Sequence, residues 1–170
     1  MARYLIFTIP VLLFIAGCGS SRKTAKVNVV PDKPAERLIT VSTSDMQELI
    51  NDGSRPILVF FYTDWCKYCE NMKRTTFRDP QVISYLNDNF YYVPFNAEQK
   101  DKLSVAGTEF SYKARGGGNG THEFAEIMAT TDGELKYPTI VIFNKDLEIM
   151  FKYNSFLSAL ELLPILRDFY

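Results

Sequence analysis

Two cysteines separated by two residues are the part of this sequence best suited to chemistry. They lie in the segment Trp65-Cys66-Lys67-Tyr68-Cys69. Thiol–disulfide exchange needs one thiolate that attacks a disulfide and a second thiol that resolves the mixed disulfide. Two intervening residues place the first sulfur at the start of a helix and the second one turn further along. We therefore predict that Cys66 and Cys69 form a redox-active pair.

The position of each thiol on the expected helix suggests its role. At a helix N-terminus, unpaired backbone N–H groups and the helix dipole favour a thiolate. This assigns Cys66 as the nucleophile and Cys69 as the resolving residue. Lys67 adds a positive charge beside Cys66, and Tyr68 occupies a position between the cysteines that tunes the redox potential.

Other uses of the cysteine pair fit the sequence less well. Zinc normally takes four protein ligands, and only Cys18 and His122 could complete the set. A purely structural disulfide across so short a loop would remove almost no chain entropy. We expect neither a metal nor a cofactor. His122, the single histidine, is either half of a catalytic Cys–His pair or a polar residue at a helix start.

A buried strand followed by a helix is expected to hold the cysteines. Residues 57–62 form a continuous apolar run rich in branched and aromatic side chains, which is typical of a central strand buried on both faces. A helix over residues 66–77 would then carry Cys69. The remaining pattern predicts strands at 38–41, 90–95, 139–143 and 147–153, and helices at 44–50, 80–89, 97–105, 121–128 and 155–168.

Two of these helices have recognisable start signals. Ser44 and Gln47 have the spacing of a capping box at the first helix. Thr121 is a candidate cap for the helix that runs through Met128. Thr121 would thus mark the end of the least regular stretch of the chain.

That stretch, residues 107–120, contains five of the nine glycines. Glycine permits backbone conformations that other residues avoid. The segment is either a mobile surface loop or a flap beside the active site that contacts partners.

The motifs resemble those of one family. Residues 57–69 resemble the strand-to-active-site segment of thioredoxins, and Tyr137-Pro138-Thr139 resembles their cis-proline segment. The resemblance implies an α/β thioredoxin fold over residues 38–170. It would have a central mixed sheet flanked by helices and an insertion before the cis-proline.

The resemblance also implies roles for residues near the cysteines. Pro138 would be cis and pack against the cysteine pair. The backbone of Tyr137 would then be open to pair with an extended substrate segment, as in strand addition. Trp65 resembles the tryptophan that shields the thiols, although simple packing is an alternative.

One residue departs from the thioredoxin pattern at the site itself. Thioredoxins carry a buried aspartate six residues before the first cysteine, where this chain has Phe60. Another group has to take the proton of Cys69, and the candidates are water, Glu70 and Lys73.

The chain's further resemblance is to exported members of the superfamily. The segment Phe77-Arg78-Asp79-Pro80-Gln81-Val82 and the insertion look like periplasmic reductase domains of transmembrane electron carriers and related lipoproteins.

The N-terminus is predicted to be an export signal. Residues 4–16 are uncharged and mostly apolar, but too few to span a bilayer comfortably. Ile15-Ala16-Gly17-Cys18 resembles a bacterial lipobox. This implies a signal peptide at 1–17, lipid attached to Cys18 and a tether over 18–37. An ordinary cleaved signal with an unrelated cysteine is the alternative.

Composition limits the remaining function classes. Hydrophobic residues make up 46% of the chain and the net charge is −1, which suits a packed domain and not a nucleic-acid binder. We expect a monomeric reductase or isomerase that acts on disulfides of exported proteins. It would exchange electrons with a membrane donor or acceptor and be lipid-anchored in the bacterial cell envelope, facing the periplasm or the exterior. The alternative is a non-catalytic lipoprotein scaffold in envelope assembly or cytochrome maturation.

Overall fold

The computed structural model describes residues 37–170. The expected signal peptide at 1–17, the lipid site at Cys18 and the tether up to residue 36 lie outside the described residues. Across residues 37–170, no helix combines the length and the apolar character needed to cross a bilayer.

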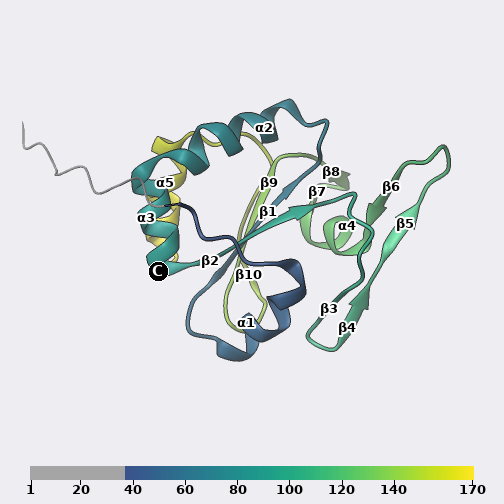
Figure 1. The fold of residues 1–170 in the computed structure, drawn as a ribbon, viewed down its shortest axis with the longest axis horizontal. Helices are drawn as coiled ribbons and strands as arrows, with labels where there is room; N and C mark the ends of the chain where they lie inside the picture. Colours follow the sequence, from purple (N-terminus) through teal and green to yellow (C-terminus); the bar gives the residue numbers. More distant parts are fainter. Residues whose placement is uncertain (1–36) are drawn as a thin grey trace, which may run out of the picture. The chain divides into compact units, whose positions relative to one another are not determined.

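A four-stranded mixed sheet forms the centre of the fold (Figure 1). Its strands, in spatial order, are β10 (Ile149–Tyr153), β9 (Thr139–Phe143), β1 (Ile57–Tyr62) and β2 (Tyr91–Asn96). β1 pairs in parallel with β2 and antiparallel with β9, so that Val59 lies between Val93 and Val141. The mixed sheet expected from the sequence is confirmed.

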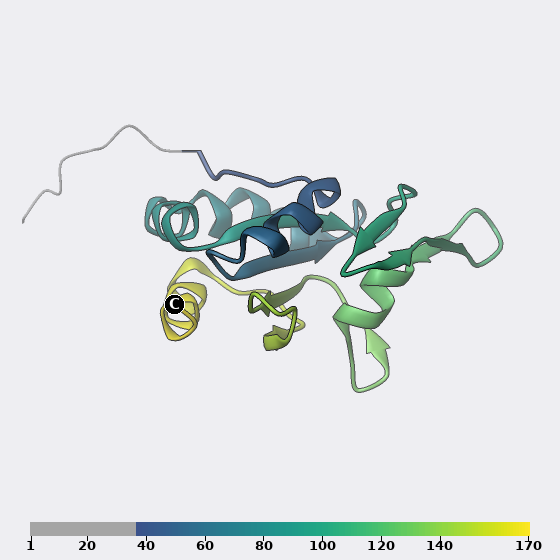
Figure 2. The same ribbon diagram turned by 90° about the horizontal axis from the view of Figure 1, so that it is seen from below.

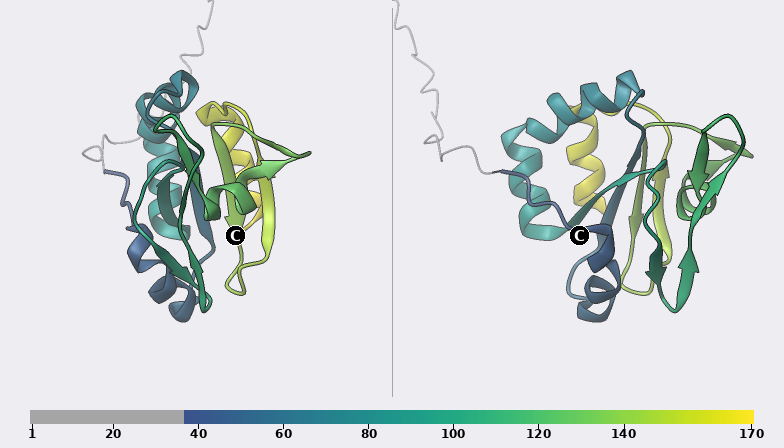
Figure 3. Two further views of the ribbon diagram at one scale, coloured as in Figure 1. Left: turned by 90° about the vertical axis from the view of Figure 1, so that its right-hand side faces the viewer. Right: turned by 45° about the vertical axis from the view of Figure 1, so that its right-hand side comes forward.

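Helices cover both faces of the sheet (Figure 3). One face carries α2 (Lys67–Arg74), α3 (Pro80–Asn89) and α5 (Ala159–Asp168), and the other carries α1 (Met46–Asp52) and α4 (Glu123–Ala129). Successive side chains of β1 point to opposite faces of the sheet. Phe60 packs in the cluster with α2, α3 and α5, whereas Phe61 packs in the cluster with α1 and α4. The side of the sheet that carries α2, α3 and α5 is called the α2 face below, and the side that carries α1 and α4 is called the α4 face. Every residue from Ile57 to Phe61 is buried, which explains the continuous apolar run.

The insertion between β2 and β9 contains more strand than the sequence suggested. It forms two hairpins and one short pair, which Figure 2 shows extending beyond the end of the main sheet. The strands are β3 (Leu103–Val105), β4 (Thr108–Phe110), β5 (Tyr112–Ala114), β6 (Gly120–His122), β7 (Thr130–Thr131) and β8 (Glu134–Leu135).

The prediction of a helix at 97–105 is wrong, because the segment contains strand β3. Leu103 and Val105 are buried while Ser104 between them is exposed, which is the period of a strand and not of a helix. The stretch 107–120 is likewise not a single irregular loop, because β4 and β5 lie within it. Its glycines at 116–118 have positive φ and form the turn between β5 and β6.

The expected first strand and first capping box are also wrong. Residues 38–41 form only one isolated bridge, from Thr40 to Tyr92. A short 3-10 turn capped by Ser42 precedes α1. Gln47 does not cap the helix, because its side chain accepts a hydrogen bond from the backbone of Ala106 at 2.7 Å.

Two helix boundaries near the active site differ from the expectation. The helix expected over 66–77 ends at Arg74, and a 3-10 turn follows at Thr76–Arg78. Buried Thr76 donates a hydrogen bond to the carbonyl of Leu157 at 2.6 Å, which joins this turn to the segment before α5. The last helix starts at Ala159 rather than at residue 155.

Candidate active site

The cysteine pair lies where β1 leads into α2. Cys66 and Cys69 form a disulfide with an S–S distance of 2.01 Å. Cys66 is the N-cap of α2, and its Sγ accepts a hydrogen bond from the backbone N–H of Cys69 at 3.1 Å. The first sulfur therefore sits where helix N–H groups stabilise negative charge, as the spacing predicts.

The two sulfur-bearing residues differ in their access to solvent. Cys66 is 6% exposed and Cys69 is fully buried. An incoming thiol or disulfide can therefore approach Cys66 but not Cys69. This asymmetry fits the predicted roles of attacking and resolving thiol.

The surroundings of Cys69 on the α2 face are apolar. Its cluster includes fully buried Phe60 and Met72 and nearly buried Phe77. The rings of Phe60 and Phe77 meet edge to face at 4.8 Å. Phe60 fills the position of the thioredoxin aspartate with a packed ring, so that residue offers no proton acceptor.

The two residues proposed as substitutes for that acceptor lie on α2. Glu70 is exposed to solvent. Lys73 is half-buried, and its Nζ lies 3.4 Å from the centre of the Tyr62 ring. Lys73 therefore approaches the apolar cluster, whereas Glu70 does not.

Trp65 is held in an exposed position beside the pair. Its side chain is 67% exposed, and its Nε1 donates a hydrogen bond to the carboxylate of Glu98 at 2.9 Å. Its ring meets the ring of Tyr137 nearly edge-on at 6.0 Å. Contacts on two sides thus orient the indole next to Cys66.

Sequence reasoning missed the anchor of Trp65. Asn96 accepts a hydrogen bond from the backbone of Glu98 at 3.0 Å and donates one to Asp64 at 3.1 Å. Together with the indole bond, these contacts link the turn after β2 to the loop before Cys66. Because β1 and β2 are parallel, their carboxyl ends meet at one edge of the sheet. That rule could have identified Asn96 and Glu98.

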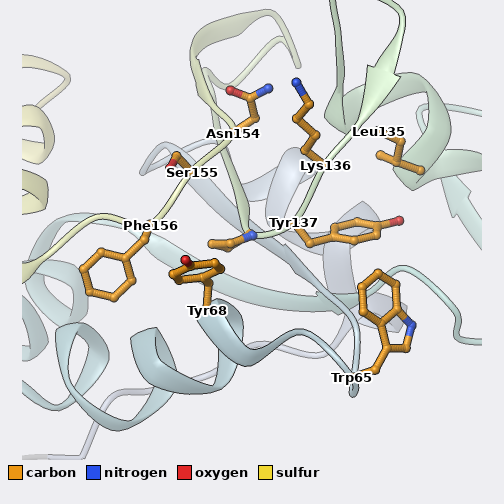
Figure 4. Close-up of a pocket in the computed structure, with 9 residues that line it drawn as sticks. Trp65, Tyr68, Leu135, Lys136, Tyr137, Asn154, Ser155 and Phe156 are labelled. Atoms are coloured by element: carbon orange, nitrogen blue, oxygen red, sulfur yellow. The ribbon is translucent and has the colours of Figure 1, made fainter.

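A groove runs along the active site on the cis-proline side (Figure 4). The groove has a volume of about 480 Å³. The peptide bond between Tyr137 and Pro138 at its side is cis, as the resemblance implies. The groove is lined by Trp65, Tyr68, Leu135, Lys136, Tyr137, Pro138, Asn154, Ser155 and Phe156. Four of these are aromatic, which suits contact with an extended peptide. The contributions of residues 154–156 were not anticipated, because nothing in their types indicates a site.

Of three further residues predicted to support the site, two line this groove and one does not. Tyr68 is 67% exposed and lies near Phe156 in Figure 4. Burial raises the pKa of Tyr137 above its ordinary value, so its hydroxyl stays neutral at physiological pH. Lys67 is exposed at the first position of α2 and is not among the lining residues.

His122 belongs to the α4 face and not to the active site. It is fully buried, and its ring packs against Phe95 at 5.1 Å. Its Nδ1 accepts a hydrogen bond from the backbone N–H of Phe124 at 3.2 Å, which makes it the cap of α4. Because Nδ1 accepts, Nε2 carries the proton and donates to the carbonyl of Asp101 at 3.0 Å. The interpretation as a helix-start residue is confirmed, and His122, not Thr121, is the cap.

A metal at the cysteine pair would need further ligands close to the two sulfurs. Within residues 37–170, no three His, Cys, Asp or Glu side chains converge as ligands. The remaining candidate ligand, Cys18, lies outside these residues.

A disulfide at a helix N-terminus, open at one sulfur and flanked by a cis-proline, is the arrangement of a thiol–disulfide oxidoreductase. The family model described as a thioredoxin-like domain matches residues 43–170. The chain therefore belongs to the thioredoxin-like domain family.

Similar proteins agree with this class. The chain is 34% identical over 71 residues to the thiol:disulfide interchange protein DsbD of Photorhabdus laumondii, covering 37% of this chain. It is 30% identical over 88 residues to the protein of that name from Citrobacter koseri, covering 52% of this chain. These matches span only 12% and 14% of the relatives' own lengths.

A solved structure shares the fold. A DsbH oxidoreductase superposes with a TM-score of 0.55, covering 86% of this chain and 95% of its own, at 15% identity. At that identity the likeness shows the thioredoxin fold alone. The combination of family, fold and cysteine pair supports a thiol–disulfide oxidoreductase.

Proposed function

We propose that this protein reduces or isomerises disulfides of exported proteins. The observation that carries the proposal is a buried cysteine pair of which only Cys66 is accessible, beside an aromatic groove at cis-Pro138. A substrate segment in the groove would present its disulfide to Cys66, with the Tyr137 backbone available for strand pairing.

The reaction follows from the positions of the two sulfurs. In the reduced protein, the Cys66 thiolate attacks one sulfur of the substrate disulfide, and the other substrate sulfur leaves as a thiolate. Cys69 then loses its proton and attacks Cys66 Sγ, which releases the second substrate thiolate. Two electrons pass to the substrate, and the protein is left with the Cys66–Cys69 disulfide.

Repeated turnover as a reductase requires a source of electrons. We propose a membrane electron donor that reduces the Cys66–Cys69 disulfide. If the pair is oxidising instead, the corresponding partner is a membrane acceptor. The relatives are named thiol:disulfide interchange proteins, which supports exchange of the Cys66–Cys69 disulfide with a redox partner.

The proposed location is the bacterial cell envelope. A lipid on Cys18 would hold the domain at the membrane, facing the periplasm or the exterior. The test is to express the full chain and Cys18→Ser in a bacterium and to compare their membrane fractions. Loss of membrane association in the variant supports the lipid, and unchanged association contradicts it.

Activity assays separate reduction from isomerisation. Reduced full-length protein is expected to cleave insulin disulfides with excess dithiol as donor. Reactivation of scrambled ribonuclease would show isomerase activity. No turnover in either assay would favour the non-catalytic scaffold.

The reduction potential of the cysteine pair sets the direction of electron flow. A value of about −270 mV would indicate a reductase and about −120 mV an oxidase. Because Trp65 is the single tryptophan and adjoins Cys66, its fluorescence in glutathione or dithiothreitol buffers can follow the equilibrium directly.

A further inference from the structure

The resolving step has to create a negative charge in an apolar environment. Cys69 is fully buried, and its cluster on the α2 face includes Phe60, Met72 and Phe77. An unpaired charge among such side chains is costly unless another group stabilises it. Some feature of this chain therefore has to compensate for the absence of the thioredoxin aspartate.

Lys73 is placed to compensate. It follows Cys69 by four residues on α2, and residues with this spacing lie on the same face of a helix. Side chains on a helix point back toward its N-terminus, so Lys73 extends over the turn that contains Cys69.

The Tyr62 ring holds the ammonium of Lys73 at the edge of the cluster. Nζ lies 3.4 Å from the ring centre, a close cation–π contact. Tyr62 in turn stacks on Phe60 at 5.7 Å, and Phe60 belongs to the cluster of Cys69. Among the salt bridges of residues 37–170, none involves Lys73. Its charge is thus not neutralised by a carboxylate of the described chain.

None of the other titratable groups named for this region combines a positive charge with a place at the edge of the cluster around Cys69. Burial raises the pKa values of Tyr62 and Tyr92, which keeps both hydroxyls neutral. Asp64, which also raises the pKa of Tyr62, and Glu70 are both exposed and acidic. Lys67 is exposed at the start of α2, beside Cys66.

We propose that Lys73, held by the ring of Tyr62, supplies the positive charge that stabilises the thiolate of Cys69. The inference rests on the proposed exchange function. In the resolving step, water takes the proton of Cys69, and the thiolate attacks Cys66 Sγ in the mixed disulfide. The Cys66–Cys69 bond forms, the bond from Cys66 to the substrate breaks, and the substrate sulfur leaves as a thiolate. Lys73 keeps its proton throughout.

The test is a pH titration of Cys69 in the full-length chain. The changes Cys18→Ser and Cys66→Ala leave Cys69 as the one remaining thiol of three. Thiolate formation is followed by ultraviolet absorbance in this background and after adding Lys73→Met. The acid dissociation constant of Cys69 is expected to fall roughly threefold to tenfold when the charge is lost.

Two further variants separate a local effect from a general one. Lys73→Arg keeps the charge and is expected to restore most of the dissociation constant. Arg74→Met removes the same charge from an exposed neighbour on α2 and is expected to change it little. An unchanged titration in Lys73→Met, or equal shifts in Lys73→Met and Arg74→Met, would overturn the inference.

A kinetic readout keeps this inference separate from the proposed function. Release of a small thiol from a mixed disulfide with Cys66 measures the resolving step alone, because Cys69 is the attacking group. Lys73→Met is expected to slow this release most at low pH. If the titration of Cys69 in the single-thiol background depends on Lys73 but the wild-type chain reduces no protein disulfide, the proposed function fails while the role of Lys73 stands.

Discussion

The two faces of the central sheet use buried polar groups in different ways. On the α2 face, the redox pair lies among packed rings, and Phe60 occupies the place of an acid. On the α4 face, buried His122 has a hydrogen-bond partner at each ring nitrogen. The ion pair between Lys113 on β5 and Glu123 on α4, at 2.9 Å, adds to the polar contacts of this face. The redox pair therefore lies within the apolar cluster of one face, whereas the buried histidine and its hydrogen bonds lie on the other.

The largest expected effect comes from removing the accessible sulfur. Cys66→Ser is expected to abolish insulin reduction, because no nucleophile remains at the groove. The matched change Lys67→Ser, on the next residue, is expected to retain turnover. Comparable turnover in wild type and Cys66→Ser would contradict the assignment of Cys66.

Adjacent phenylalanines on β1 allow a direct comparison of the two faces. Phe60→Ala and Phe61→Ala each remove a fully buried ring, so each is expected to lower the free energy of unfolding by about 3–5 kcal/mol. Urea denaturation measures both.

Only the change on the α2 face is expected to alter redox chemistry. Phe60→Ala opens space beside Cys69 and should shift the reduction potential of the pair, whereas Phe61→Ala should leave it close to wild type. Equal shifts in the two variants would show that the faces are not chemically distinct.

The anchor of Trp65 gives an intermediate effect. Glu98→Ala removes the hydrogen-bond acceptor of the indole, an exposed bond worth about 1 kcal/mol. Insulin reduction is expected to fall by about fivefold, the equivalent of that energy, because the indole is less well oriented at the groove. Glu98→Gln keeps an acceptor and should retain most activity. The fluorescence anisotropy of Trp65 should fall in Glu98→Ala, and unchanged anisotropy would argue against an anchoring role.

The smallest effect concerns the α4 face and its pH dependence. Burial lowers the pKa of His122 below its ordinary value of 6.5. The unfolded chain therefore binds more protons than the folded chain as the pH falls below 6.5, and stability declines across that range. Above pH 6.5 the neutral state of buried His122 makes its full contribution to the stability of the folded chain.

Urea denaturation at several pH values checks this prediction. Asparagine is also a good helix cap, so His122→Asn keeps a cap on α4 while removing the titration. Its stability should vary less with pH just below 6.5 than that of wild type. A hydrogen bond from Lys113 lowers the pKa of Glu123 to about 2, so that carboxylate stays charged throughout the range. Identical slopes in the two proteins would contradict the neutral, buried state of His122.

Local sequence patterns were sufficient to predict the strand and the helix that position the cysteine pair. The apolar run of β1 and the cysteine spacing at the start of α2 each carry their own structural signal. The cis geometry before Pro138 followed from the family resemblance.

The insertion and the groove could not be predicted in the same way. The strands of the insertion are two or three residues long, which is too short for an alternation of buried and exposed residues to be recognised. Leu103 and Val105 are equally compatible with a helix. Asn154 and Ser155 reach the groove only through the pairing of β10 with β9. Such contacts depend on which strands become neighbours, a property that local sequence does not specify.

The central claim is that Cys66 attacks and Cys69 resolves. The most direct measurement is mass spectrometry of full-length Cys69→Ser after reduction, removal of reductant and incubation with a disulfide-containing protein. The account predicts a stable mixed disulfide located at Cys66, and none in Cys66→Ser. An adduct at Cys69 in Cys66→Ser, with none at Cys66 in Cys69→Ser, would contradict it.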